Sequence, residues 1–135
     1  MIGKMMGNLR KLRVSFGMEN DFTLSNKHFG DSNFFLILDI YENGDYKFLE
    51  KRKNTSLDTA NEKIHGDVKK FRSLILLLND VDILVAYRMG PNYLNIKNKT
   101  NKIPFLTRTD NFQESLEIIK LNFEKLWEDK IKKSI

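Results

Sequence analysis

The chain has 135 residues, with 23 Lys and Arg against 18 Asp and Glu, and a formal net charge of +5. This length suits one domain, residues 1–135, with a core at about residues 9–124, a short basic N-terminal extension and a C-terminal helical tail. The lack of cysteine excludes a disulfide framework, a thiolate zinc site and an iron–sulfur cluster held by cysteines of this chain. Residues 1–11 hold no apolar run long enough for a signal peptide or a membrane span, so we expect a cytoplasmic protein.

The first half of the chain predicts three β-strands. Residues 12–18 alternate apolar and polar side chains, which is the period of a strand with one apolar face. Residues 34–41 are nearly continuously apolar, as is typical of a strand buried on both faces, and Asn43-Gly44 is expected to supply the two positive-φ positions of a tight hairpin. Residues 46–52 form the returning strand, and their charges indicate the edge of a sheet.

The second half of the chain alternates helices and strands. We expect a helix capped by Asp67 that runs to about Asn79, a buried parallel strand at 83–87, a short helix at 92–97 and a last strand at 103–107. The side chains expected on the core face of the first of these helices are Val68, Phe71, Ile75 and Leu78. Three strands followed by this alternation predict an α/β fold whose central mixed sheet carries helices on both faces.

A final helix is predicted to begin near Asp110, where Gln113 completes an approximate capping box. Its core face is marked by apolar side chains at helical spacing: Phe112, Leu116, Ile119, Phe123 and Trp127. Residues 125–135 mix apolar and charged side chains, which fits either a fraying end or a partner contact.

The charge is segregated along the chain. Residues 21–50 contain six acids against two bases, whereas residues 51–72 and 88–110 each have an excess of four positive charges. If the two basic segments converge in the fold, they attract an anion such as a nucleic acid, a phosphorylated metabolite or an anionic metal cluster. For any single lysine, a solvated surface position is the simpler interpretation.

Three short motifs suggest one site: residues 25–30 (Ser-Asn-Lys-His-Phe-Gly), 64–66 (Ile-His-Gly) and 88–91 (Arg-Met-Gly-Pro). The two histidines of the chain, His28 and His65, lie in two of them, close to glycines. A histidine ligates metals or carries charge near neutral pH, and a nearby glycine lets a ligand approach the backbone. The third motif follows a predicted parallel strand, at the end of the sheet where α/β proteins bind ligands.

Each of these side chains also has a structural explanation. Either histidine can cap a loop or a helix without binding a ligand. Arg88 either bonds backbone carbonyls at the end of the strand or binds an anion through its forked donors. Met89 has a thioether that soft metals bind, but methionine more often fills gaps in a core, and we expect packing here.

Six stretches together carry a family resemblance: residues 25–30, 52–54, 65–66, 81–90, 104–107 and 110–111. In order and spacing, across about residues 12–122, they resemble the dinitrogenase iron-molybdenum cofactor biosynthesis family. These are small proteins with a ribonuclease H-like fold that carry or protect iron–sulfur cofactor precursors during nitrogenase assembly. The resemblance implies a ribonuclease H-like three-layer fold around a mixed five-stranded sheet.

The resemblance also implies a non-enzymatic carrier of an anionic iron–sulfur or iron–molybdenum–sulfur cluster, bound as cargo. Its implied partners are cofactor-assembly or nitrogenase proteins, and we expect a monomer or weak homodimer. Such a cluster needs an imidazole for an open metal position, N–H donors toward its sulfides and positive charge nearby. The implied cofactor-binding residues are His28, Phe29, Gly30, His65, Gly66, Arg88, Met89 and Gly90, with His28 and His65 as the metal ligands.

Three further residues bear on this pocket. Arg52 and Asn54 end the third predicted strand and are candidates to approach it. Tyr93 stands where family members often have a small residue, and we expect it to crowd the pocket.

Two other functions compete with the carrier. An interaction module of the same fold binds no cluster even without oxygen. A nucleic-acid-binding protein would use the basic segments, but the chain has no basic strand interleaved with aromatic residues.

Enzymatic functions find less support in the sequence. Two-metal nuclease chemistry needs several carboxylates near the first strand, and residues 9–18 contain none. Asp39 and Asp82 lie in or before other strands, and Asp110 is expected to cap a helix. A P-loop, a dinucleotide fingerprint and a cysteine nucleophile are also missing.

Overall fold

The computed structural model describes residues 8–59 and 66–134. The strands in these residues are β1 (Lys11–Met18), β2 (Phe34–Tyr41), β3 (Tyr46–Lys53), β4 (Ile83–Ala86) and β5 (Ile103–Leu106). The α-helices are α2 (Gly66–Leu77), α3 (Asn92–Lys99), α4 (Phe112–Leu121) and α5 (Phe123–Lys133), and two 3-10 helices are η1 (Phe29–Asp31) and η2 (Thr55–Thr59). Within the described ranges, every helix is too short or too polar to cross a membrane.

The strands form one mixed sheet in the order β3-β2-β1-β4-β5. The pairs β1–β2 and β2–β3 are antiparallel, whereas β1–β4 and β4–β5 are parallel. The predicted five-stranded mixed sheet is therefore confirmed, and β3 lies at one edge, as its charges indicated. Because β1 and β4 run in the same direction, the loops that follow them leave from the same end of the sheet.

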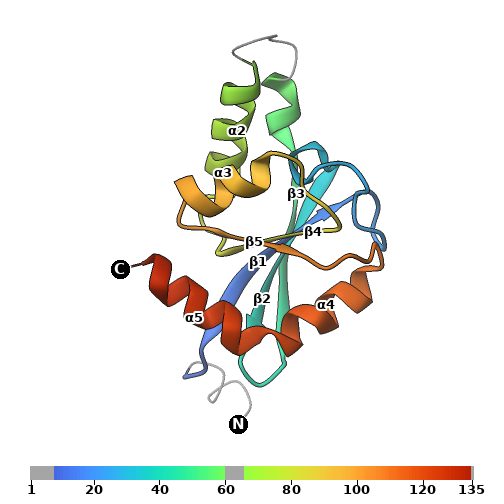
Figure 1. Ribbon diagram of the computed structural model, residues 1–135. Coiled ribbons are helices and arrows are strands. Elements are labelled where there is room, and N and C mark those ends of the chain that lie inside the picture. The colour runs from blue at the N-terminus through green and yellow to red at the C-terminus, as the bar shows by residue number, and fades with distance from the viewer. Residues whose placement is uncertain (1–7, 60–65, 135) are drawn as a thin grey trace.

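Helices cover both faces of the sheet and give the predicted three layers (Figure 1). The first core joins one face to α4 and α5, and its members include Phe16, Leu38, Val85, Leu116 and Phe123. The second core joins the other face to α2, α3 and η1, and its members include Phe29, Phe35, Leu74, Leu84 and Ile96. β2 contributes to both cores, which explains why its sequence lacks a polar face.

Helix α2 differs from its prediction at the start and in its buried face. Gly66, the first described residue of this segment, is already helical, so Asp67, the predicted cap, lies inside the helix. Leu74 is 1% exposed and Leu78 is fully buried, whereas Val68, predicted to face the core, is 53% exposed. The first turn of α2 borders an open pocket that Val68 lines, so the apolar stripe extends beyond the contact with the sheet.

The cap of α4 is one residue later than predicted. The side-chain oxygen of Asn111 accepts a hydrogen bond from the Glu114 N–H at 2.9 Å. Asp110 instead connects this segment to the loop after β1, because its carbonyl accepts from the Leu24 N–H at 2.7 Å. An asparagine satisfies a free N–H group at a helix start as well as an aspartate does.

The predicted final helix is in fact two helices, α4 and α5, which meet at Asn122. The side-chain amide of Asn122 donates to the Ile118 carbonyl at 2.7 Å, and this bond competes with the helical pattern of the backbone. The predicted apolar stripe packs on the first core across the break, from Phe112 to Trp127. The tail is therefore a packed helix through Lys133.

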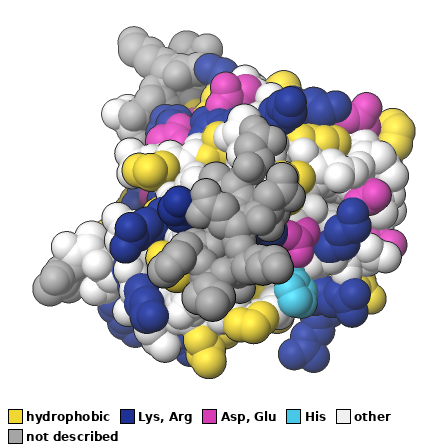
Figure 2. Space-filling view, turned by 90° about the horizontal axis from the view of Figure 1, so that it is seen from above, with side chains coloured by type: hydrophobic (Ala, Val, Ile, Leu, Met, Phe, Trp, Pro, Cys, Tyr) yellow, Lys and Arg dark blue, Asp and Glu magenta, His cyan; other side chains and the backbone are white. Residues whose placement is uncertain are grey.

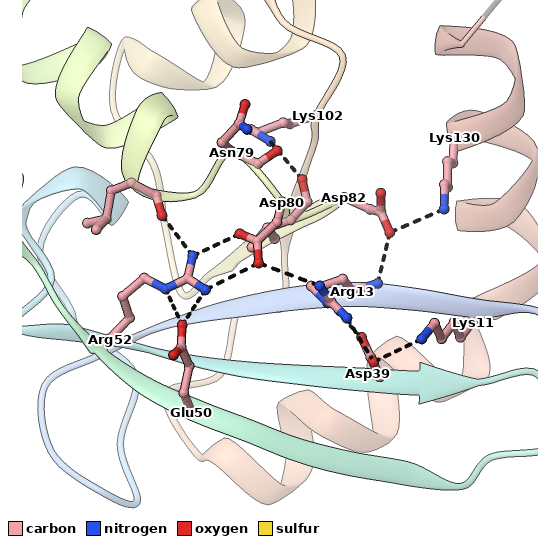
Figure 3. Close-up of polar contacts among 12 residues, drawn as sticks. Lys11, Arg13, Asp39, Glu50, Arg52, Asn79, Asp80, Asp82, Lys102 and Lys130 are labelled. Atoms are coloured by element: carbon pink, nitrogen blue, oxygen red, sulfur yellow. Dashed lines mark hydrogen bonds and ion pairs between the residues drawn. The ribbon is translucent and has the colours of Figure 1, made fainter.

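Ion pairs gather at the amino ends of β1 and β4 (Figure 3). Asp39, whose side chain is 3% exposed, pairs with Arg13 at 2.9 Å and with Lys11 at 3.4 Å. Asp80 pairs with Arg52 at 2.9 Å, and hydrogen bonding to this guanidinium lowers the pKa of Asp80. The carboxylates at this end are therefore neutralised within the protein.

Asp82 belongs to the same network. Its carboxylate accepts a hydrogen bond from the Arg13 backbone N–H at 2.9 Å and lies 3.3 Å from the Nζ of Lys130. Asp39 and Asp82, the strand carboxylates weighed for nuclease chemistry, thus both have structural partners. Their arrangement gives a two-metal nuclease no support.

Candidate functional site

The loop after β1 holds His28 on the surface. The Ser25 N–H donates to the Gly17 carbonyl at 3.0 Å and ties the loop to the strand. Phe29 is 1% exposed in the second core, with its ring centre 4.9 Å from that of Phe35. Because Phe29 anchors the chain in the core, its neighbour His28 lies at the surface with an exposed side chain.

The imidazole of His28 rests on the backbone of Gly90. A Cβ atom built on Gly90 would lie 2.6 Å from Nε2 and 2.7 Å from Nδ1 of the imidazole. Any residue larger than glycine would therefore displace the ring. His28 precedes η1, yet its side chain makes no capping hydrogen bond to that helix. The contact with Gly90 brings the first and third sequence motifs together.

A second contact joins the same two motifs. The Nε of Arg88 donates to the Asn26 carbonyl at 2.5 Å. The hydrogen bond corresponds to the first of the two roles considered for Arg88, in which its side chain bonds a backbone carbonyl at the end of the strand. Met89 packs partly buried against the second core, which is the packing role expected for it.

A pocket of about 730 Å³ opens beside His28. Its walls are the loop that carries His28 and Gly30, helix α2, and helix α3 with the preceding Pro91. In the view from above, a histidine side chain lies exposed beside Lys or Arg and Asp or Glu side chains (Figure 2). The volume falls within the range of about 300–1,000 Å³ that small ligands occupy.

Cations from both basic segments surround this pocket. Lys70 and Arg72 come from α2 and Lys99 comes from the end of α3. Lys70 forms an ion pair with Asp31 of η1, whereas the side chains of Arg72 and Lys99 are exposed. The charged side chains that line the pocket therefore carry a net positive charge, which favours an anionic ligand.

The other candidate residues have different surroundings. Gly30 lines the pocket, and its carbonyl accepts a hydrogen bond from the Asn54 side chain at 2.9 Å. Asn54 also donates to the Ser32 carbonyl at 2.7 Å, so it supports the loop from within the protein. Arg52 extends instead to the Leu77 carbonyl at 2.7 Å and to Asp80.

The middle motif lies largely outside the described residues. Ile64 and His65 fall outside them, and Gly66 is the first residue of α2. The prediction that Tyr93 crowds the pocket is wrong, because Tyr93 lines a separate groove beside β5. Asn92, next to it in the chain, lines the pocket beside His28.

Sequence reasoning missed the α3 wall of the pocket. Asn95 and Lys99, four residues apart, share one helical face and both line it. The sequence feature that could have identified these two residues is their spacing of four, shortly after the Arg-Met-Gly-Pro motif. Arg72 on α2 was also missed as an individual residue, since one exposed arginine on a helix gives no local pattern.

In residues 8–59 and 66–134, no cluster of three or more His, Cys, Asp or Glu side chains is suited to hold a metal ion. The pocket beside His28 offers a ligand one imidazole, three cations, two asparagine amides, one carboxylate and several apolar side chains.

These features define an α/β protein with an open, positively charged pocket beside the carboxyl ends of its central strands. Residues 10–119 match the family model described as dinitrogenase iron-molybdenum cofactor, so the chain belongs to that family. The recognition made from the sequence is confirmed, and the family connects the protein with biosynthesis of the iron–molybdenum cofactor of nitrogenase. No curated protein matches the chain significantly. The matched region ends within α4, so α5 lies beyond it.

Proposed function

We propose that the protein is a non-enzymatic carrier of an anionic iron–sulfur or iron–molybdenum–sulfur cofactor precursor, which it holds as cargo in the pocket beside His28. One observation carries the proposal. The imidazole of His28 rests on Gly90, without a capping hydrogen bond, at the rim of a pocket of about 730 Å³. An imidazole, which is a group that ligates metals, therefore lies beside a space large enough for a small cluster.

The chemistry of the pocket suits such a cargo. A neutral imidazole offers one ring nitrogen to an open metal position of the cluster. Arg72 and Lys99 supply positive charge toward its sulfides. Few ligands suit a carrier, because the cargo has to leave again. The absence of a side chain at Gly90 leaves room for the imidazole at the rim of the pocket.

We extend the proposal to a second metal ligand, to partner proteins and to the fold family. His65 is proposed as a second metal ligand on the strength of its sequence motif. Cofactor-assembly or nitrogenase proteins are the proposed partners, and the protein is proposed to act in the cytoplasm as a monomer or weak homodimer. The fold is proposed to be ribonuclease H-like, supported by the strand order β3-β2-β1-β4-β5 with helices on both faces.

Anaerobic titration tests the carrier function. Purified protein is mixed without oxygen with an iron–sulfur or iron–molybdenum–sulfur precursor, and the visible absorption of the complex is followed after gel filtration. We expect a stoichiometric complex with the wild type, weaker binding for His28→Ala and loss of binding for His28→Ala/His65→Ala. Lys47→Gln is the matched control, since Lys47 is exposed on β3 at the far edge of the sheet.

Two outcomes would contradict the proposal. Full binding by the double histidine variant would mean that the cargo lies elsewhere. No absorption with any precursor would favour an interaction module of the same fold. Titration with an oligonucleotide at two salt concentrations checks the remaining alternative, because phosphate contacts weaken steeply as salt rises.

A further inference from the structure

A second groove, of about 570 Å³, lies at the β5 edge of the sheet. Its floor is β5 with the buried side chain of Leu126, and its walls come from α3 and α5. None of its lining residues lines the pocket beside His28. In Figure 1, β5 runs between α3 on one side and α5 on the other. The groove is therefore separate from the site proposed above.

Positive charge dominates the walls of this groove. Lys97, Arg108, Lys125 and Lys132 line it with exposed side chains, and Asp129 is the one acid among its lining residues. These cations come from α3, from the segment after β5 and from α5. They are spread along the groove, so they suit an anion with several separated charges better than one compact anion.

Lys133, a fifth cation that lines the groove, bonds backbone carbonyls of the protein itself. Its Nζ donates to the Thr100 carbonyl at 3.3 Å and to the Lys102 carbonyl. Burial lowers the pKa of Lys133, and the nearby charge of Lys97 lowers it further. Lys133 thereby joins α5 to the end of α3, and the remaining cations stay exposed at the rim.

The backbone of Arg108 is held in an unusual conformation. Its φ is +61°, and it is the one non-glycine residue with positive φ in the described part of the chain. This region disfavours residues with a Cβ atom by about 1–2 kcal/mol. A glycine would relieve that cost, yet the position carries an arginine whose side chain lines the groove. Unfavourable backbone conformations of this kind tend to occur at functional sites.

The open edge of β5 offers main-chain groups to the groove. The Ile103 N–H donates to Asp82 and the Thr107 N–H to Ala86, so these two residues face the neighbouring strand β4. Main-chain groups alternate along a strand, so the Pro104 carbonyl and the N–H and carbonyl of Leu106 face away from β4. A peptide residue opposite Phe105 can therefore bond the Pro104 carbonyl and the Leu106 N–H. Proline itself offers no N–H, which limits pairing to a short segment.

We propose that this groove binds a short, extended, acidic peptide segment of a partner protein. Acidic side chains of the segment pair with Lys97, Arg108, Lys125 and Lys132, and apolar side chains lie on the β5 floor. A peptide fits better than a nucleic acid, because the strand edge offers groups that pair with a peptide backbone. The proposal is independent of the cargo pocket, because the groove and that pocket share no lining residue.

A labelled peptide tests this docking site. The probe is a fluorescein-labelled peptide of alternating Glu and Leu, and the control peptide carries Gln in place of Glu. The variant Arg108→Gly/Lys125→Gln/Lys132→Gln removes three exposed cations, and glycine suits the backbone of position 108. We expect its dissociation constant for the probe to rise about tenfold by fluorescence anisotropy, as the loss of three exposed ion pairs implies. Lys47→Gln at the opposite edge leaves binding unchanged.

Amide NMR shifts locate the bound peptide. We expect the Glu peptide to shift the resonances of Phe105 and Leu106, and those of Gly30 and Gly90 to stay in place. Equal binding of the Gln peptide, unchanged affinity in the folded triple variant, or shifts confined to the His28 pocket would each overturn the proposal. Equal competition by a single-stranded oligothymidine would reassign the groove to nucleic acid. Circular dichroism confirms that the triple variant is folded.

Discussion

At the amino ends of β1 and β4, Asp39, Asp80 and Asp82 are each paired with arginine or lysine. At the carboxyl ends of the same strands, His28 is exposed on Gly90, and Arg72 and Lys99 line an open pocket. Charge at the amino end is satisfied inside the protein, while much of the charge at the other end is exposed to a ligand. Charged residues at the amino ends therefore stabilise the fold, whereas those at the carboxyl ends are available to a ligand.

The largest effect is expected at the paired end. Asp39→Ala leaves Arg13 without its partner of 2.9 Å and should lower the free energy of unfolding by about 3 kcal/mol. The matched control is Asp21→Ala, which breaks an exposed pair with Lys51 and should cost less than about 1 kcal/mol. Urea denaturation measures both. Equal losses in the two variants would show that burial of Asp39 adds nothing.

The next effect concerns the open end. Gly90→Ala places a methyl group where the His28 ring lies, so cargo binding should weaken about tenfold while the protein stays folded. Lys47→Gln is the control, because Lys47 is exposed on β3 and does not line the pocket. Anaerobic titration gives the affinities. Unchanged binding by Gly90→Ala would show that the position of the imidazole does not matter.

A smaller effect is expected in the pH dependence of stability. Arg52 holds the pKa of Asp80 below its ordinary value of 3.8. The ion pair therefore stabilises the folded protein above that pH, and this stabilisation is lost as the pH falls through the lowered pKa. Between about pH 6 and about pH 3, the wild type should lose up to about 1 kcal/mol more stability than Asp80→Asn. If the free energy of unfolding depends on pH equally in the two proteins, the ion pair between Asp80 and Arg52 does not stabilise the fold.

The smallest effect is expected for the stability of His28→Ala. His28 is exposed and makes no capping hydrogen bond, so the free energy of unfolding should change by less than about 0.5 kcal/mol. Thermal unfolding measures this change. If His28→Ala lowers the free energy of unfolding as much as Asp39→Ala does, His28 stabilises the fold and the two ends of the strands do not differ in this respect.

Local patterns in the sequence were enough to predict the five strands, the hairpin that joins the second to the third, and the edge position of the third. The alternation in β1, the apolar run of β2 and the Asn43-Gly44 turn each depend on near neighbours. Of the two positive-φ positions expected in that turn, Gly44 has one, with φ of 92°, whereas Asn43 does not, so that part of the prediction is wrong. The stripe from Phe112 to Trp127 was also identified correctly, because helical spacing survives the break between α4 and α5.

The rest depends on contacts between distant segments. Nothing near Val68 indicates that the first turn of α2 borders a pocket instead of the sheet. The contact between His28 and Gly90 joins residues 62 positions apart. The sequence motifs indicated that the two residues lie close together, but not how the ring lies on the glycine. The groove beside β5 needs three elements at once, so no single stretch of sequence predicts it.

The break at Asn122 sets how far the last helices reach. A straight helix over residues 112–133 would be about 33 Å long at 1.5 Å per residue. The bend at Asn122 instead turns the second half back beneath the strands, toward the β5 edge (Figure 1). The C-terminal lysines of α5 thereby form a wall of the groove beside β5.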